Sequence, residues 1–418
     1  MPLISDLFAR AMSAFGIGAD DALAVAVSGG ADSMALLKAA VDFSKQKNNR
    51  IVVLTVNHGL RPESAEEARQ VVRWARSLGV DAEILVWRGE KPQTGVEQAA
   101  RNARYALLFG ACRRLKIRNL LLGHHKRDQA ETYLMRKARG SGEIGLAGMS
   151  AVKSFAFGRM LRPFLGVEPS ELRAFARENG LPWVEDPTNA TIQFERGRLR
   201  LTTPPEVLDD AFRQTLVYGR KRRELEERVA GFYRSFLTLP PMGYAVLPVA
   251  AFSTDCAVLS YALGEVLRVV ANKPYAACKP AVEDLIARVN GGFGGATLSG
   301  CRIAPAGKNR VLIWREERSL PPAAAFDETG FALWGSFAVS ADGEAAQGLT
   351  VGAVGRPLKT DADVPKRVIP TLPAIFDNEK LCIVPHLGYK QNQMACQAVF
   401  APTFPLVQTA EWMPPLTV

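Results

Sequence analysis

Short apolar segments alternate with helical patterns over the first 200 residues of the chain. Four runs of mostly aliphatic residues have the length of buried strands, and the stretches between them have helical spacing. This alternation predicts an α/β fold with a doubly wound parallel sheet, in which ligands bind at the carboxyl ends of the strands. The predicted strands are Ala22–Val27, Ile51–Val56, Ala82–Trp87 and Asn119–Leu122, and the predicted helices cover residues 33–47, 64–78 and 96–116.

The pattern changes after about residue 202. A strongly charged helix is predicted at Arg213–Arg234, and amphipathic helices are predicted at Ala257–Ala271 and Lys279–Val289. A hairpin is predicted to pair Ala296–Cys301 with Arg310–Trp314. The Pro321-Pro322 pair predicts a linker, and the residues after it are rich in Pro, Gly and Val. We therefore expect a catalytic domain at residues 1–202, a mainly helical middle domain at 203–320 and a small β-rich module at 321–418.

Composition narrows the class of protein. The 418 residues carry a formal net charge of +10, which favours a polyanionic partner such as nucleic acid. No two of the six cysteines have the two-residue spacing of a zinc or redox pair, so reduced thiols are expected. The N-terminal segment lacks a secretory pattern, and no apolar run is long enough to cross a membrane. These features predict a cytoplasmic protein without a membrane partner.

The strongest motif follows the first predicted strand and precedes a helix. Two adjacent glycines permit a tight turn close to a ligand, and the helix start offers free N–H groups to a phosphate. A carboxylate beside that phosphate is suited to hold Mg²⁺. A simple glycine turn with a capped helix is the structural alternative. The candidate phosphate-binding residues are Ser28, Gly29, Gly30, Ala31, Asp32 and Ser33.

Further polar motifs follow the second strand and begin a later helix. His58 and Arg61 come directly after the second strand, where they can contact nucleotide or substrate, and Ser64 with Glu67 predicts a capping box. Helix capping alone is the alternative for this segment. Arg101 and Arg104 share one helix face that is suited to phosphate or RNA, with an ordinary solvated face as the alternative.

The segment after the fourth strand combines imidazole and carboxylate groups. His124 and Asp128, and likewise Asp128 and Glu131, are about one helical turn apart. These groups are suited to bind Mg²⁺ or to position a nucleophile, whereas zinc is not expected without a third ligand. Local capping by Asp128 is the structural alternative.

Three arginine-containing segments complete the candidate site. Arg139 lies in a glycine-rich segment that predicts either a ligand-wrapping loop or a mobile surface loop. Arg196, Arg198 and Arg200 alternate in a pattern that fits phosphates or an ordinary basic loop. The run from Arg220 to Arg223 predicts either an RNA contact or a solvated helix face.

Residues 28–33 resemble the signature of the PP-loop ATP pyrophosphatases, a Rossmann-like α/β class. In this order, the motifs resemble the tRNA(Ile)-lysidine synthetases across residues 20–200, most specifically in HHKRDQAET, RGSG and GLAGM. The segment Leu358–Tyr389 is similar to the terminal module of that family. Two departures concern the basic run: Gly197 stands where a polar residue is usual, and Pro204-Pro205 follows where a continuous helix is usual.

The resemblance implies an ATP-dependent carbon–nitrogen ligase that acts on isoleucine tRNA with a CAU anticodon. The C2 oxygen of the wobble cytidine is adenylated with release of pyrophosphate, and free L-lysine then displaces AMP to give lysidine. ATP is the co-substrate, and Mg²⁺ is expected at Asp32 and Asp128. Whether the enzyme is a homodimer is left open.

The resemblance also gives expected roles to the candidate residues. Asp128 and His124 are the alternatives for the base that takes a proton from the attacking lysine. The catalytic group comprises Asp32, His124, Asp128, Arg101 and Arg104, and the tRNA or phosphate group comprises His58, Arg61, Arg139, Arg196, Arg198 and Arg200.

Two other functions fit parts of the pattern. A PP-loop tRNA cytidine thiolase commonly carries paired cysteines, whereas Cys112 stands alone in the catalytic half of this chain. A catalytically inactive RNA-binding relative would not need Asp32, His124 and Asp128, which are all present.

Overall fold

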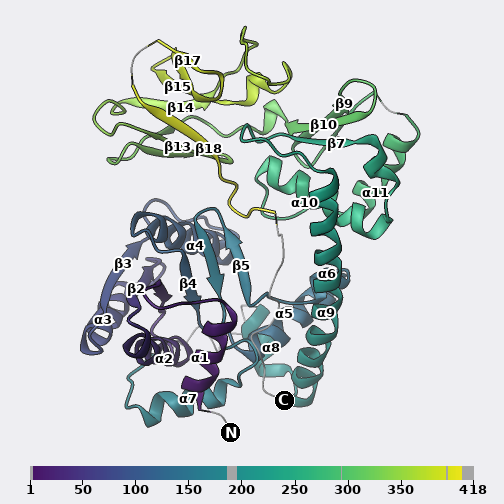
Figure 1. Ribbon diagram of the computed structural model, residues 1–418. Helices are drawn as coiled ribbons and strands as arrows, with labels where there is room; N and C mark the ends of the chain where they lie inside the picture. The colour runs from purple at the N-terminus through teal and green to yellow at the C-terminus, as the bar shows by residue number, and fades with distance from the viewer. Residues whose placement is uncertain (1–2, 186–194, 293, 392–393, 407–418) are drawn as a thin grey trace. The chain divides into compact units, whose positions relative to one another are not determined.

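A six-stranded sheet organises the first part of the chain in the computed structural model (Figure 1). Its order is β3-β2-β1-β4-β6-β5, and all neighbouring strands are parallel except β5, which pairs antiparallel with β6. The predicted parallel sheet is confirmed, and the β5–β6 hairpin extends it at one edge. The strands are β1 (Ala22–Ala26), β2 (Arg50–Asn57), β3 (Asp81–Val86), β4 (Asn119–Leu122), β5 (Val152–Phe155) and β6 (Gly158–Leu161).

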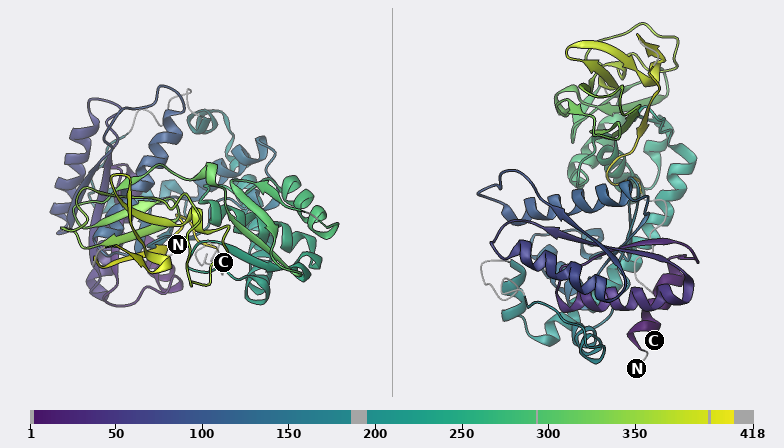
Figure 2. Two further views of the ribbon diagram at one scale, coloured as in Figure 1. Left: turned by 90° about the horizontal axis from the view of Figure 1, so that it is seen from above. Right: turned by 90° about the vertical axis from the view of Figure 1, so that its left-hand side faces the viewer.

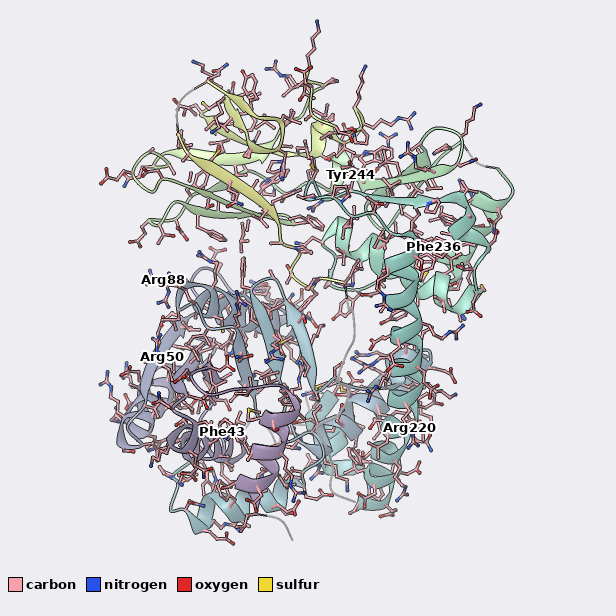
Figure 3. All side chains as sticks on the ribbon, in the orientation of Figure 1. Phe43, Arg50, Arg88, Arg220, Phe236 and Tyr244 are labelled. Carbon is pink, nitrogen blue, oxygen red and sulfur yellow. The ribbon has the colours of Figure 1, made fainter. Side chains whose placement is uncertain are left out.

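Helices cover both faces of this sheet (Figures 1 and 2). On one face, Phe8 packs edge-on against Phe43, which is labelled in Figure 3, and both belong to a core that also contains Phe164. The first helix was not predicted, although its apolar side fills this core. The helices are α1 (Ile4–Ala14), α2 (Ala31–Lys47), α3 (Ser64–Ser77), α4 (Val96–Arg114), α5 (Lys126–Ala138), α6 (Glu143–Leu146), α7 (Pro169–Glu178) and α8 (Glu195–Thr202).

The parallel strands bring the sequence motifs to one edge of the sheet. β1, β2 and β4 each end directly before a polar motif, so their carboxyl ends place these motifs side by side. Gly123, which follows β4, lets the chain lie close to the start of α2, because a Cβ atom there would lie only 3.3 Å from the backbone oxygen of Asp32. The end of β4 therefore touches the first turn of α2.

The structure describes residues 3–185, 195–292, 294–391 and 394–406. The chain forms two compact units that divide between Glu224 and Leu225. Helix α9 (Pro205–Phe236) begins in the first unit and ends in the second. The division into three domains remains a prediction.

The second unit begins with helices and continues with strands. Helices α10 (Cys256–Ala271) and α11 (Lys279–Asn290) pack with the small sheet β7-β10-β9-β8, and the predicted helices are confirmed. Two further sheets, β11-β14-β15-β16-β17 and β12-β13-β18, confirm the predicted strand-rich end. A buried cluster joins Trp314 of β10 to Ile369 and Leu381, so both parts of this unit share one core.

The strands of the second unit have the following bounds. They are β7 (Ala245–Pro248), β8 (Ala296–Leu298), β9 (Cys301–Pro305), β10 (Arg310–Arg315), β11 (Ala324–Ala325), β12 (Phe331–Trp334), β13 (Phe337–Ala341), β14 (Leu349–Ala353), β15 (Pro373–Asp377), β16 (Lys380–Val384), β17 (Tyr389–Lys390) and β18 (Cys396–Phe400).

The predicted hairpin in this unit was wrong in its pairing. β8 pairs with β9, and β9 pairs with β10, so the segment 296–301 does not pair with 310–314 as one strand. The reason is a tight turn at Ser299-Gly300, where both residues have positive φ and reverse the chain within the predicted strand. Within the described residues, no helix is long and apolar enough to cross a membrane.

A glycine substitution tests the packing of the edge hairpin. A Cβ atom at Gly158 would lie 2.2 Å from the backbone oxygen of Arg118, whereas one at Gly110 in α4 would meet no atom within 4 Å. We expect Gly158→Ala to lower the free energy of unfolding by about 1–3 kcal/mol. Gly110→Ala, the control, should raise it by about 0.5–1 kcal/mol because glycine is unfavourable in a helix. Urea unfolding measures both, and equal stability of the two variants would contradict this packing.

Candidate active site

The loop between β1 and α2 has a backbone conformation that requires glycine at position 29. Gly29 has a φ of 90°, and a Cβ atom there would lie 3.1 Å from a methyl group of Val71. The hydroxyl of Ser33 donates to the carbonyl of Gly30 at 2.9 Å and accepts from the amide of Ser28 at 3.2 Å. The loop is thereby closed on itself, with the N-terminus of α2 at its end. This arrangement is suited to bind phosphate.

Asp32 lies in the first turn of α2 beside this loop. Its side chain is 32% exposed, and its Oδ2 atom lies 3.6 Å from Nε2 of His125. Its Oδ1 atom is buried and has no hydrogen-bond partner among the residues that the structure describes. Since a buried oxygen without a partner is costly, this atom fits a cation or a donor that arrives with a ligand.

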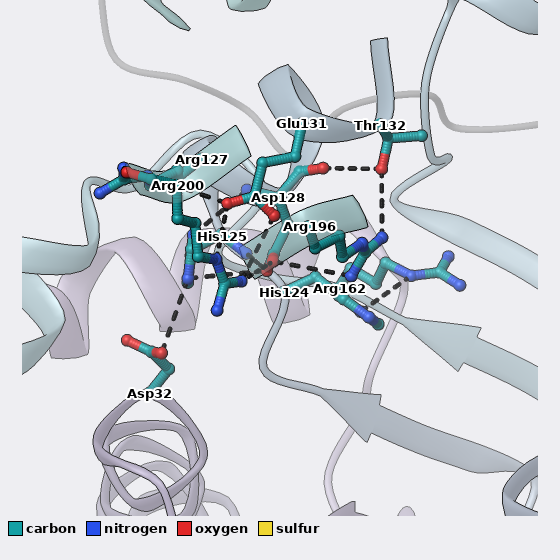
Figure 4. Close-up of polar contacts among 10 residues, drawn as sticks. All are labelled: Asp32, His124, His125, Arg127, Asp128, Glu131, Thr132, Arg162, Arg196 and Arg200. Carbon is teal, nitrogen blue, oxygen red and sulfur yellow. Dashed lines mark hydrogen bonds and ion pairs between the residues drawn. The ribbon is translucent and has the colours of Figure 1, made fainter. Parts of the chain in front are cut away.

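His125 connects Asp32 to the start of α5. Its Nδ1 accepts from the amide of Asp128 at 3.4 Å, and its own amide donates to Oδ2 of Asp128 at 3.1 Å. Its Nε2 lies 3.6 Å from Oδ2 of both Asp32 and Asp128 (Figure 4). Burial lowers the pKa of His125, but the two carboxylates outweigh burial and raise it above 6.5. Sequence reasoning missed this residue, although it lies between two motif positions.

His124 has the opposite electrostatic environment. Its Nδ1 accepts from Nε of the buried Arg162 at 3.3 Å, and Arg162 also donates to the carbonyl of Ser150 at 2.7 Å. Burial, followed by the charge of Arg162, holds the pKa of His124 well below 6.5. His124 is therefore neutral, and because Nδ1 accepts, its proton is on Nε2. Arg162 was not among the predicted site residues, because only the fold brings it into contact with His124.

Helix α8 supplies positive charge to the carboxylates of α5 (Figure 4). Arg200 donates to the fully buried Glu131 at 2.7 Å and to Oδ1 of Asp128 at 3.3 Å, and Arg196 lies 4.0 Å from the same oxygen. Burial raises the pKa of Asp128, but His125, His124 and Arg196 outweigh burial and lower it to about 2. Asp128 is therefore ionised.

The three arginines predicted from the alternating pattern do not all lie on one face of α8, and their roles toward phosphate or tRNA remain predictions. Arg196 and Arg200 are four residues apart and share the face of α8 that contacts α5, while Arg198 lies two residues along and is exposed. Gly197, the departure noted in the sequence, is buried. The chain bends at Pro204-Pro205 only after Arg200, so the second departure leaves this face of α8 intact.

Helix α4 adds a cluster of arginines around one tyrosine. Arg101 lies with its guanidinium carbon 5.2 Å from the ring centroid of Tyr105. Burial raises the pKa of Tyr105, but Arg101, Arg162 and Arg104 outweigh burial and lower it. Burial lowers the pKa of Arg104, while attraction from Tyr105 and Asp128 opposes this effect. Arg104 thus lies close to His124, and Arg101 lies close to Tyr105 and Arg162, while the catalytic roles of both arginines remain predictions.

The motif after β2 lies near the same arginines. His58 stacks edge-on against Trp87, and burial, together with the charges of Arg104 and Lys91, lowers its pKa. Arg61 donates to Glu67 at 2.7 Å. The predicted capping box is wrong, because Ser64 is the first residue of α3 rather than its N-cap and Glu67 is bound to Arg61.

The glycine-rich segment after α5 is fixed by its neighbours. Arg136 donates to the carbonyls of Gly145 and Gly148 at 2.6 and 3.0 Å, and the side chain of Gln129 bonds both backbone groups of Met149. Arg139 forms an ion pair with Glu195 at the start of α8. The prediction of a mobile loop is not supported by these contacts, and the role of Arg139 toward tRNA remains a prediction.

The basic run of α9 is divided between structural and exposed positions. Arg222 is buried and donates to Ser150 Oγ at 2.7 Å and to the carbonyl of Gly148 at 3.3 Å. Lys221 pairs with Glu143 at 2.5 Å. Arg220 is exposed (Figure 3). The interpretation of this run as one exposed RNA patch is therefore wrong for Arg222.

Stability measurements distinguish these two kinds of arginine. We expect Arg222→Ala to lower the free energy of unfolding by about 1–3 kcal/mol, because buried acceptors lose their donor. Arg220→Ala, two positions away on the same helix, should change it by less than about 0.5 kcal/mol. Urea unfolding of both variants measures the difference, and an unaffected Arg222→Ala protein would show that these contacts do not stabilise the fold.

The charge states of the histidines are measurable by NMR titration, since the chain has only four. We expect His125 to titrate above 6.5 and its pKa to fall in Asp128→Asn, while His386 of the second unit remains unchanged as the internal control. Because folding raises the pKa of His125, its stabilising contribution is present at low pH and is lost as the pH rises through the folded value. An unchanged pKa of His125 in Asp128→Asn would contradict the proposed contact.

Comparisons with known proteins agree with this geometry. Residues 6–207 match the model of the PP-loop domain. In an alignment 425 positions long, the chain is 30% identical to a tRNA(Ile)-lysidine synthase of Wolbachia sp. subsp. Brugia malayi, and the alignment covers 94% of each protein. It is 36% identical to the synthase of Hyphomonas neptunium, covering 73% of this chain and 84% of that relative.

A third match covers about half of the chain. It is 44% identical to the synthase of Methylobacterium nodulans and covers 49% of this chain and 60% of that relative. The PP-loop match and the near full-length similarity to the Wolbachia protein together establish the family. The chain belongs to the tRNA(Ile)-lysidine synthase family.

Proposed function

We propose that the protein joins free L-lysine to C2 of the wobble cytidine in isoleucine tRNA with a CAU anticodon. The reaction consumes ATP and releases pyrophosphate and AMP, so the protein is an ATP-dependent carbon–nitrogen ligase. One observation supports this function most strongly. The phosphate loop and the HHKRDQAET segment meet at His125, whose Nε2 lies 3.6 Å from both Asp32 and Asp128.

The loop at residues 28–33 is the proposed site of the ATP triphosphate. The start of α2 supplies amide donors, and Ser28, whose hydroxyl donates to Oγ of Ser33 at 3.3 Å, is exposed. Mg²⁺ bound with ATP would neutralise phosphate charge, and it commonly needs only one or two protein carboxylates. The described residues contain no group of three metal-ligating side chains. Asp32 fits such an ion, because its buried Oδ1 lacks a protein partner in the described part of the chain.

Asp128 is less suited to hold the ion. One of its oxygens faces His125 and the other faces Arg200 and Arg196, so positive groups already surround it. The same charges keep it ionised at neutral pH. We therefore assign the metal preferentially to Asp32 and propose that Asp128 acts on the second substrate.

In the first step, the C2 oxygen of the cytosine forms a bond to the α-phosphate, and pyrophosphate leaves. Negative charge that develops on the phosphate is stabilised by fixed cations. Arg104 and Arg196 supply such charge beside His124. Neutral His124 can donate from Nε2, because Arg162 binds its other nitrogen.

In the second step, the ε-amine of lysine forms a bond to C2, and the bond between C2 and the adenylated oxygen breaks to release AMP. The ammonium must lose a proton before it is a nucleophile. Of the two candidate bases, ionised Asp128 is suited to attract and orient the ammonium, but its pKa of about 2 makes it a weak proton acceptor. His124 would gain a positive charge among Arg162, Arg104 and Arg196, whereas Asp128 is already negative and attracts an ammonium.

Sulfur transfer is less consistent with this site. Cys112 is the one cysteine of residues 1–224, and burial raises the pKa of its thiol to about 12. A thiolate is therefore not available there for sulfur chemistry.

The test combines pyrophosphate release with mass analysis of the wobble nucleoside. With isoleucine CAU tRNA, ATP and lysine, we expect a mass gain equal to lysine minus water. Pyrophosphate release without this product would contradict lysine as the nucleophile.

Replacement of Asp32 tests the ATP site. We expect Asp32→Ala to reduce pyrophosphate release by at least about 10²-fold, because phosphate charge loses its compensation, while tRNA affinity changes only a few-fold. Asp42→Asn is the matched control, since Asp42 lies on the same helix and pairs with Lys38. Normal turnover by Asp32→Ala would exclude the proposed role of this carboxylate.

A further inference from the structure

A basic cavity of about 660 Å³ lies in the first unit outside the candidate active site. The end of α4, the turn that follows it and the turn between β5 and β6 form its walls. Its lining includes Arg113, Lys116 and Arg118 from the first two segments and Phe157 and Gly158 from the third. None of these residues belongs to the motifs that the proposed reaction uses.

The cavity is at the opposite edge of the sheet from the ATP loop. Arg118 immediately precedes β4, and Gly158 begins β6, which runs parallel to β4 with Asn119 beside Arg159. His124 follows the other end of β4. Four residues of strand span about 13 Å, so one phosphate group cannot occupy both places. Ligands of α/β sheets bind at the carboxyl ends of the strands, which explains the position of the ATP loop but not a binding site at the amino ends, where this cavity lies.

The walls of the cavity are held in fixed positions. Lys116 has a φ of 56° at the end of α4, where its amide donates to Arg113 and the next amide donates to Cys112. Glycine is usual in this left-handed helix ending, so a lysine is present despite a conformational cost. At Gly158, the hairpin approaches the backbone of Arg118 so closely that no Cβ atom would fit.

All the charged side chains that line the cavity are positive. Three of its lining residues are cationic, and none is a carboxylate. The nearby Glu83 forms an ion pair with Arg114, which does not line the cavity. Lys116 and Arg118 are both exposed to solvent. A concave surface with several cations and no anion is suited to phosphate.

We propose that this cavity binds a phosphate group, and that the group belongs to the backbone of the RNA substrate. The RNA source rests on the proposed function, whereas phosphate binding itself does not. The contact would position the tRNA without reading its sequence, because phosphates carry no base information.

The test replaces Lys116 and Arg118 together in the full-length protein. Lys116→Gly removes a charge and suits the left-handed backbone, and Arg118→Gln retains a polar side chain of similar reach. Arg69→Gln with Arg73→Gln is the matched control, because both arginines lie on α3, pair with Glu66 and carry the same total charge. Affinity for isoleucine tRNA is measured between 50 and 200 mM salt, and inorganic phosphate binding is measured by calorimetry.

We expect the plot of log affinity against log salt to become shallower by about 1.5–2 for the Lys116/Arg118 variant, as two lost phosphate contacts imply. The control should change it far less. If only calorimetric phosphate binding falls, the cavity takes free phosphate and the RNA source is overturned. If neither measurement differs from the control, the phosphate site itself is overturned.

The rate of lysidine formation at saturating tRNA distinguishes a failure of the phosphate site from a failure of the proposed reaction. Both variants should form lysidine at the wild-type rate when tRNA is saturating, because neither changes the active site. If the wild-type protein makes no lysidine but loses phosphate binding on substitution, the proposed function fails while the phosphate site stands.

Discussion

The contact of one imidazole with two carboxylates is the interaction on which the candidate site depends. Asp32 belongs to the phosphate loop, Asp128 belongs to the first turn of α5, and Nε2 of His125 lies 3.6 Å from both. Because Nδ1 of His125 accepts from the amide of Asp128, the ring proton is on Nε2, and this N–H faces the oxygens of both carboxylates. The raised pKa of His125 agrees with this contact. The site for ATP and the proposed site for lysine are thereby held in one arrangement.

The remaining buried charge is balanced by helix α8. Asp128 and the fully buried Glu131 would be costly without partners, and Arg196 and Arg200 provide them. A second network supports His124, in which Arg162 is held by the carbonyl of Ser150 and the hydroxyl of Ser150 is bound by Arg222 of α9. Ser150, which follows the glycine-rich segment, therefore connects Arg222 of α9 to Arg162 and so helps to hold His124 in place.

This arrangement is consistent with the chemistry of adenylation. Phosphoryl charge is stabilised best by groups that are already in place and need no reorganisation. His124 is neutral and Asp128 is ionised although they are only four residues apart, because Arg162 approaches the first and Arg196 with His125 approach the second. Neighbouring residues with opposite electrostatic tendencies are suited to donate a proton in one step and attract a cation in the next.

The sequence by itself determined the parallel sheet, its first four strands, the phosphate loop and the family, because aliphatic runs, glycine pairs and motif order are local properties of the chain. It did not determine the role of His125, Arg162 or Arg222, since each acts through a residue that is distant in sequence or on another element. It also predicted a capping box at Ser64 that the pairing of Arg61 with Glu67 replaces. Charge state and burial depend on which elements pack together, and for that physical reason only the tertiary structure decided them.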